Sequence, residues 1–220
     1  LSSSSAASDV YKRQIQYWAQ EEQPTMLREM TLTWQRLNPG WSYRCFNRAT
    51  ASLFFKDVFG VSVQEDFLSI RLPAMQADVF RVAYILTYGG LWADAATTCL
   101  SPLEHWLDPQ SPLVLLRRPH MHSAQVANGF IYAHQPQHPF LEAVWSSIAS
   151  ALARRAGTGV WTMFGAGIFG KTLMDVNLAR QVRVVEVRDI TQHLSFGSSS
   201  MFMPAEQHWS TREKHEPLYL

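Results

Sequence analysis

Cysteine, net charge and long apolar runs are all scarce in this sequence. Cys45 and Cys99 lie far apart and without metal-ligand spacing, so we expect two buried free thiols in a reducing compartment. A formal net charge of +1 leaves no electrostatic footprint for nucleic acid or an anionic membrane. No apolar run approaches the roughly 18–20 residues that cross a bilayer. We therefore expect a cytoplasmic protein that binds no nucleic acid, and we leave a position at the membrane surface open.

The bulk of the chain is ordinary globular sequence. Its 220 residues are 47% hydrophobic and suit one medium-sized domain. Eight tryptophans favour stacking on sugars, on bases or in a core, without choosing among these. Residues 1–14 are rich in serine and alanine and contain no apolar segment of the kind found in signal peptides. We expect them to be a non-native or disordered leader, with a single domain over residues 15–220.

Strand-like and helix-like segments alternate along that domain. The clearest helical pattern covers residues 72–88, and Gly89 after it suits a left-handed cap. Other expected helices cover 25–37, one or two pieces within 50–69, 139–153, and a segment after a glycine-rich turn at 165–173. Expected strands cover 15–20, 42–47, 91–93, 112–116, 129–134 and 182–187. Such alternation predicts an α/β sandwich around a mixed sheet.

The stretch "DVFRVAYILTYGGLWADAATT", residues 78–98, concentrates polar chemistry in one place. Asp78 and Arg81 are three apart, so they share a helix face and can form an ion pair. Asp94 ends a short strand, which is where open α/β sheets present ligand groups. Taken singly these features are compatible with a surface pair worth about 0–1 kcal/mol. In this order they indicate a site where Arg81 neutralises a phosphate or orients Asp78, and Asp78 accepts from a sugar or ribose hydroxyl.

"ADVFRVAYILTYGGLWADAATTCLSPL" resembles the DXD-motif sugar-transferase superfamily, and most closely its capsular polysaccharide synthesis protein family. It is also similar to initiating mannosyltransferases and clostridial toxin glucosyltransferase domains. Three further segments resemble the family in the same order: "QYWAQEEQP", "TWQRLNPGWSY" and "VANGFIYAHQPQHPFL". Together they cover roughly residues 15–175.

This resemblance implies a GT-A type fold, with a nucleotide-binding half at 15–110 and an acceptor-facing half and C-terminal loop at 111–220. The implied reaction moves a hexose from a nucleotide-diphosphate sugar to a glycan or polysaccharide hydroxyl, with retention of configuration. A non-catalytic nucleotide-sugar or glycan-binding relative is the alternative. By position, the implied donor-binding residues are Trp18, Asp78, Arg81, Gly89, Gly90 and Asp94, and the implied catalytic residues are Asp94 and Asn128.

Two of these roles have plain structural alternatives. Trp18 would stack on the donor base, as its counterparts in the superfamily do, or serve as a core aromatic beside a strand. Asn128 matches a family position near the reacting sugar, and it would equally suit a cap on a turn.

Ala96 departs from the family pattern, because it stands where the second Asp of the DXD motif would contact a metal. Mn²⁺ and Mg²⁺ prefer oxygen ligands, which a methyl group does not supply. One outcome is a weak ion site made by Asp94, donor phosphates and a remote ligand such as His208 or the hydroxyl of Thr97 or Thr98. The others are cationic side chains that do the work of the metal, or a site that has lost activity. We favour a weak or substrate-dependent metal site.

Three further patterns carry less weight. "HWSTREKH" offers His208, Trp209, Ser210 and Arg212 as a lid over the diphosphate, or forms a solvated tail. "GAGIFGKT" fits the phosphate-loop expression, but that motif needs a preceding buried strand and its usual nucleotide-binding context. A group of histidines shows no zinc spacing and is expected to lie in loops: His120, His122, His134 and His138.

Overall fold

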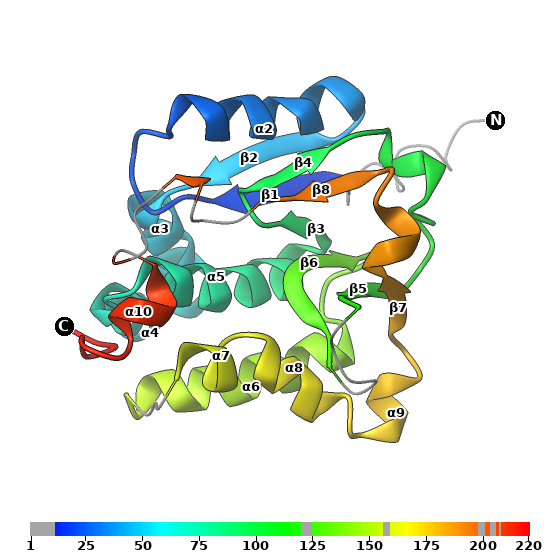
Figure 1. Ribbon diagram of the computed structural model, residues 1–220. Coiled ribbons are helices and arrows are strands. Elements are labelled where there is room, and N and C mark those ends of the chain that lie inside the picture. Colours follow the sequence, from blue (N-terminus) through cyan, green and yellow to red (C-terminus); the bar gives the residue numbers. More distant parts are fainter. Residues whose placement is uncertain (1–11, 120–124, 156–158, 198–200, 203–205, 207) are drawn as a thin grey trace.

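The computed structural model describes residues 12–119, 125–155, 159–197, 201–202, 206 and 208–220. A six-stranded sheet runs through the molecule between two layers (Figure 1). In spatial order its strands are β2 (Ser42–Phe46), β1 (Arg13–Tyr17), β3 (Gly90–Ala93), β6 (Ala127–Ala133), β5 (Leu113–Arg117) and β7 (Arg183–Glu186). β6 runs antiparallel to both of its neighbours, and the other pairs are parallel. The sheet is therefore mixed, as expected.

The chain reverses its direction of travel across the sheet at β1. It passes from β1 outward to β2 and then returns to place β3 on the other side of β1. In open α/β sheets, ligands bind outside the carboxyl ends of the strands at such a switch point. The carboxyl ends of β1 and β3 are followed by Trp18 and Asp94.

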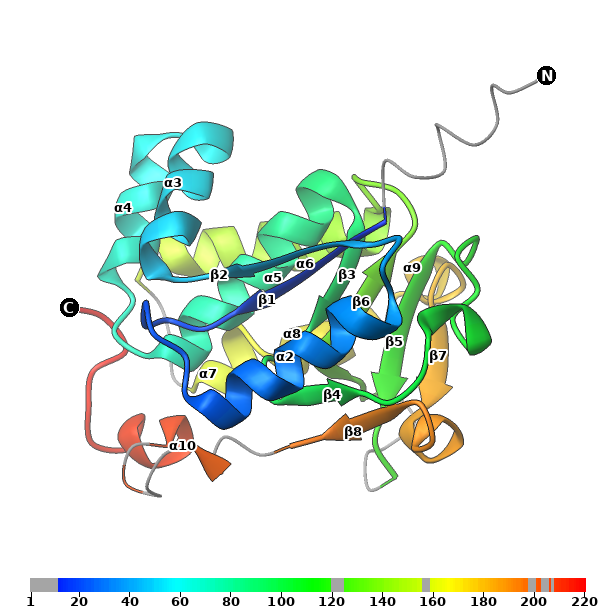
Figure 2. The ribbon, with the colours of Figure 1, turned by 90° about the horizontal axis from the view of Figure 1, so that it is seen from above.

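One layer is formed by α2 (Thr25–Leu37) and a small sheet of β4 (Thr97–Cys99) and β8 (Leu194–Phe196). The view from above shows α2 alongside β4 and β8 (Figure 2). The other layer contains α5 (Pro73–Tyr88), α6 (Pro139–Ala153) and α8 (Ala166–Thr172). The remaining helices are α3 (Arg48–Phe59), α4 (Val61–Ser69), α7 (Val160–Met163), α9 (Val176–Ala179), α10 (Trp209–Arg212), and the 3₁₀ turns Leu103–His105 and Val187–Ile190.

Each layer encloses its own hydrophobic core, because side chains along a strand alternate between the two faces of the sheet. In β5, Leu113 and Leu115 join the core beneath α5, while Val114 and Leu116 join the core beneath α2. In the second core the indole of Trp34 is buried and donates to the carbonyl of Thr97 at 2.7 Å. This bond ties α2 to β4. Among the helices that the structure describes, none has both the length and the apolarity of a membrane span.

Most expected elements are confirmed. The segment before the phosphate-loop pattern is the helix α7, and not the buried strand that this motif needs. The pattern "HWSTREKH", for which a solvated tail was one alternative, contains the helix α10, and Leu194–Phe196 form the strand β8. β1 also begins at Arg13, so the last residues of the expected leader belong to the sheet, where Gln14 pairs with Tyr43 and Leu91. Residues 1–11 of that leader lie outside the described residues.

Gly90 allows β3 to start close against β1. It has a φ of +95°, and a Cβ added there would lie 2.5 Å from the carbonyl oxygen of Arg13. Because that oxygen is backbone, it cannot move aside without shifting the strand pair.

We therefore expect Gly90→Ala to lower the free energy of unfolding by about 2–4 kcal/mol, from strain at positive φ and overpacking. Gly40→Ala is the matched control, since a Cβ there meets nothing within 4 Å. Urea unfolding of both variants measures the difference. Equal stabilities would show that β1 and β3 do not depend on this close approach.

Candidate functional site

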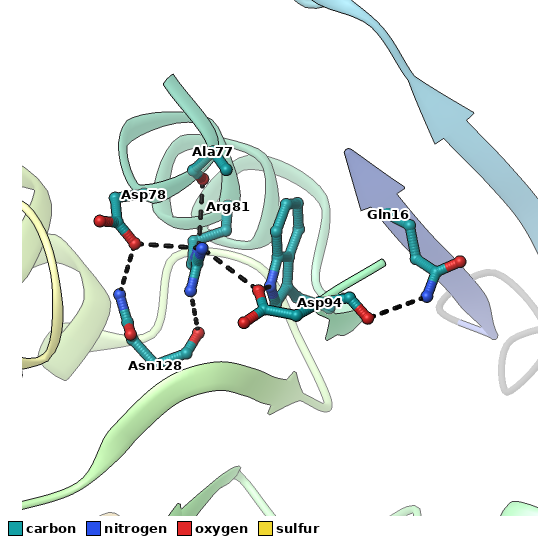
Figure 3. A network of polar contacts seen from close by, with 7 residues as sticks. Gln16, Ala77, Asp78, Arg81, Asp94 and Asn128 are labelled. Carbon is teal, nitrogen blue, oxygen red and sulfur yellow. Dashed lines mark hydrogen bonds and ion pairs between the residues drawn. The ribbon is translucent and has the colours of Figure 1, made fainter. Parts of the chain in front are cut away.

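Arg81 is the centre of a buried polar cluster at the carboxyl end of β3 (Figure 3). Its Nη2 lies 3.0 Å from Oδ1 of Asp78 and 3.2 Å from Oδ1 of Asp94. Its Nη1 donates to the carbonyl of Asn128 at 2.7 Å, and its Nε donates to the carbonyl of Ala77 at 3.2 Å. The Arg81 side chain is 6% exposed, and these four protein acceptors match four of the five N–H groups of its guanidinium.

Asp78 and Asn128 form the inner side of the cluster. The Asp78 side chain is 11% exposed, and its Oδ1 accepts from the side-chain amide of Asn128 at 2.7 Å. Asn128 therefore contacts both members of the ion pair, with its side chain on Asp78 and its carbonyl on Arg81. In this position the Asn128 amide acts as a positioning group for the Asp78 carboxylate.

Asp94 is the member of the cluster that reaches solvent, with 45% of its side chain exposed. Its Oδ1 accepts from Arg81 and, at 3.0 Å, from the indole of Trp92, whose ring lies against the guanidinium with the centroid 4.8 Å from Cζ of Arg81. Its main chain is also fixed. The amide donates to the carbonyl of Gly129 at 2.8 Å, and the carbonyl accepts from the buried Gln16 side chain at 3.2 Å.

Gly129 makes room for the second oxygen of that carboxylate. A Cβ at position 129 would lie 2.6 Å from Oδ2 of Asp94. Asp94 and Gly129 line one pocket together with Thr97, Arg118 and Gly197. Oδ1 is thus held by the protein, while Oδ2 lies beside a glycine at the pocket.

Burial raises the pKa of Asp78 to about 6, and the nearby charge of Asp94 acts in the same direction. Arg81 and the amide of Asn128 oppose this shift without cancelling it. The physical reason is that a carboxylate taken out of water loses more solvation than one shared guanidinium returns. Asp78 is therefore expected to titrate just below neutral pH.

Trp18 lies at the same edge of the sheet. It follows β1 directly and is half-buried, and its indole donates to the carbonyl of Glu22 at 3.1 Å. Its ring meets Phe202 edge to face at a centroid distance of 6.3 Å. Its stacking on a base stays a prediction.

Gly89 and Gly90 are not brought to the cluster. They lie at the start of β3, and Asp94 follows its end, so about 13 Å of extended strand separates Gly90 from Asp94. The positive φ of both glycines serves the end of α5 and the entry into β3. The structure thus gives these glycines a folding role, and a donor contact there stays a prediction.

The C-terminal segment has its own internal contacts. The ring nitrogen Nδ1 of His208 lies 2.7 Å from the hydroxyl of Ser210 at the start of α10. Arg212 forms a two-point pair with Glu216, with both distances at 2.8 Å. Glu213 accepts from the amide of Val160, which fixes α10 to α7. The proposed lid residues are therefore bonded within this segment, and their contact with a diphosphate stays a prediction.

A metal ion has few ligands at this site. Among the described residues, no group of three or more His, Cys, Asp or Glu side chains is placed to hold one. Oδ1 of Asp94 already accepts from two donors, so this residue offers Oδ2, with Thr97 on the same pocket. These protein ligands alone do not amount to a resident metal site.

The remaining sequence patterns have structural explanations. "GAGIFGKT" follows a helix instead of a strand, so the context of a phosphate loop is absent. His138 caps α6, and His134 lies in the loop before it, as expected, whereas His120 and His122 lie outside the described residues. Both cysteines are free; Cys99 is buried, Cys45 is half-buried, and burial raises the pKa of the Cys45 thiol to about 11.

Sequence reasoning missed Gln16, Trp92 and Gly129 as parts of the site. Each supports Asp94 from a neighbouring strand or from β3 itself. Gln16 lies in the strand sequence RQIQY, and a glutamine in a strand expected to be buried was the one available signal, because a buried amide needs a hydrogen-bond partner.

Stability should report the titration of Asp78. Its pKa is higher in the folded chain than the value of about 3.9 for an unfolded aspartate. The folded state therefore binds more protons between pH 4 and 6, and the free energy of unfolding falls as pH rises through this window. Relative to Asp78→Asn, which cannot titrate, the wild type should lose on the order of 3 kcal/mol. Urea unfolding at several pH values measures the difference, and a gain with rising pH would show that the Arg81 ion pair dominates.

A family model and a curated relative both match parts of this sequence. The model of the family described as capsular polysaccharide synthesis protein matches residues 3–152. HOC1 of Saccharomyces cerevisiae, which carries a provisional glycosyltransferase name, is 26% identical over 102 residues, covering 42% of this chain. That match covers 24% of HOC1, so the chain spans about a quarter of this curated relative.

Two solved structures described as glycosyltransferases are also similar. The PaToxG glycosyltransferase is 12% identical, with a TM-score of 0.54 over 78% of this chain and 72% of that chain. A glycosyltransferase involved in the glycosylation of the major capsid of PBCV-1 is 12% identical, with a TM-score of 0.46 over 92% and 98% of the two chains. The likeness to PaToxG is one of fold, and the expected GT-A-like architecture is confirmed. Because the family model covers more than half of the sequence, this chain belongs to the capsular polysaccharide synthesis protein family.

Proposed function

We propose that this protein is a glycosyltransferase that moves a hexose from a nucleotide-diphosphate sugar to a hydroxyl of a glycan or polysaccharide. Its family and the fold it shares with PaToxG support a glycosyltransferase. The observation that carries the proposal is the position of Asp94: an exposed carboxylate at the switch point of the sheet, held by Arg81 from inside. A rigid, pre-oriented acceptor is what recognition of sugar hydroxyls requires.

The donor is proposed to lie across the carboxyl ends of β1 and β3. Trp18 follows β1 and would stack on the base, while Oδ2 of Asp94 would accept from a hydroxyl of the ribose or the transferred sugar. Asp78 is buried and Asn128 is half-buried beside it, so their proposed part is to fix Arg81 and, through it, Asp94. The pocket lined by Asp94, Gly129 and Arg118 takes residues from both proposed halves of the chain, so it is the proposed place where donor and acceptor meet.

In a transfer with retention, one bond breaks, one bond forms and one proton moves. The bond between the anomeric carbon and the diphosphate oxygen breaks, and the acceptor oxygen bonds to that carbon on the same face. The departing phosphate oxygen takes the proton of the acceptor hydroxyl. The protein would hold the donor in place and exclude water, so that the incoming hydroxyl is the nearest nucleophile.

A divalent ion, Mn²⁺ or Mg²⁺, would supply positive charge to the leaving diphosphate when bound. Among the described residues that line the pocket, Asp94 is the one that carries a carboxylate, so we propose that ion binding is weak and depends on the donor's own phosphates. His208 stays a proposed remote ligand.

Ala96 favours a second candidate, a relative that binds a nucleotide sugar without transferring it. Both candidates would bind a nucleotide sugar, but only the enzyme would convert it to product. Transfer or slow hydrolysis of the donor by the purified protein supports the enzyme, whereas binding without product supports the second candidate.

The first test combines a thermal-shift screen of nucleotide sugars, with and without Mn²⁺, with product detection for each binder. A true donor raises the apparent stability, since it binds the folded state. Asp94→Asn should reduce turnover about 100-fold or more, and the exposed Asp57→Asn on α3 is the matched control. If no nucleotide sugar binds, or if Asp94→Asn keeps full turnover, the proposal fails.

A second test moves the carboxylate without removing it. In Gly129→Ala the new methyl group overlaps Oδ2 of Asp94, a flexible side-chain atom, so the fold should tolerate it while the carboxylate turns away. We expect kcat/KM to fall about 10-fold or more, with Gly40→Ala as the control at an open position. Unchanged kinetics in a folded Gly129→Ala protein would contradict the role given to Oδ2.

A further inference from the structure

The positive charge of Arg81 is already paired with acceptors of the protein. Its guanidinium bonds two carboxylates and two backbone carbonyls and is 6% exposed. It therefore cannot turn toward an incoming phosphate without abandoning Asp78 or Asp94. With both carboxylates ionised, the cluster of one guanidinium and two acids carries a net negative charge. A leaving diphosphate is instead stabilised by positive charge placed near it.

Arg118 is the cation that faces this gap. It follows the carboxyl end of β5, is exposed, and lines the same pocket as Asp94, Thr97 and Gly129. Within the part of the chain that the structure describes, Arg118 forms no ion pair. Its neighbour Arg117 differs, because it is bound to Glu186 at 3.0 Å and to the carbonyl of Gln125 at 3.2 Å.

The chemistry of the pocket suits a phosphate at this place. Two of its lining residues, Gly129 and Gly197, have no side chain, and its polar groups are those of Asp94, Thr97 and Arg118. The rest of its wall is apolar and is formed by Leu116, Ala127, Phe130, Val187 and Phe196. An arginine fork can bond two phosphate oxygens at once, and it keeps its charge at every relevant pH. Asp94 on the same pocket would repel a phosphate placed directly on it, which directs the anion toward Arg118 and leaves Oδ2 for hydroxyl groups.

We propose that Arg118 binds the diphosphate of the donor and supplies the positive charge that stabilises it as leaving group. This inference rests on the proposed function, and it gives the pocket two ends: a carboxylate for sugar or ribose hydroxyls and a guanidinium for phosphate. It also assigns the role of a charge-bearing partner to the residue that follows β5, outside the segment that resembles the DXD motif.

The test is calorimetric titration of the full chain with UDP, GDP, ADP and inorganic pyrophosphate, each in EDTA and in Mn²⁺. The wild type should bind one of the nucleoside diphosphates in EDTA. Arg118→Ala should weaken that binding about 10- to 100-fold, and Arg118→Lys should recover part of it. The corresponding nucleoside, which lacks phosphate, should bind both proteins equally. Arg180→Ala, at an exposed arginine after α9, is the matched control.

Two results would overturn the inference while leaving the proposed function intact. Arg118→Ala could bind the nucleoside diphosphate as tightly as the wild type in EDTA. Alternatively, the wild type could bind it in Mn²⁺ alone, with Arg118→Ala equal to it, so that the ion supplies the charge. A wild type that binds no diphosphate and no nucleotide sugar in either condition would instead remove the proposed function itself. Thermal unfolding of each variant verifies that it is folded.

Discussion

The bond set of Arg81 is the constraint on which the rest of the site depends. A guanidinium that is almost fully buried is costly unless every donor finds an acceptor. Here the acceptors come from three elements: Ala77 and Asp78 on α5, Asp94 after β3, and Asn128 on β6. The same residue therefore fixes the exposed carboxylate and joins α5 to the sheet. Removing it would leave two buried or half-buried acids facing each other.

The neighbouring strands of the sheet hold the backbone of Asp94 at the place where that cluster forms. β3 lies between β1, which is parallel to it, and β6, which is antiparallel, so the end of β3 is bordered by the end of one strand and the start of another. From β1 comes Gln16, which holds the carbonyl of Asp94, and from β6 comes Gly129, whose carbonyl holds the amide. The backbone of Asp94 is thus fixed from both sides, and the position of its carboxylate is set by the bonds that Oδ1 accepts from Arg81 and Trp92. A loop alone would not hold it so firmly.

The local parts of this arrangement could be predicted from the sequence, and the long-range parts could not. The helices 25–37 and 139–153 were predicted to the residue, since apolar spacing and a terminal proline act within one segment. The Asp78–Arg81 pair follows from helical spacing, and the place of Asp94 follows from a strand end. β4 and β8 have three residues each and pair across nearly a hundred positions, so no local pattern marks them. For the same reason the contacts of Gln16, Gly129 and Arg118 with the site became visible only when strands distant in sequence were placed side by side.

Charge balance connects Ala96 to the rest of the cluster. Two acids share one guanidinium, and burial raises the pKa of Asp78, which is the response of a carboxyl group with too little compensation. A third carboxylate at position 96 would add negative charge beside the pocket that is proposed to accept a diphosphate. It would be tolerable with a tightly bound divalent ion and unfavourable without one. Under the proposed function, the neutral Ala96 and the cation of Arg118 on the same pocket would act together, because the protein itself would supply the positive charge that a metal otherwise brings.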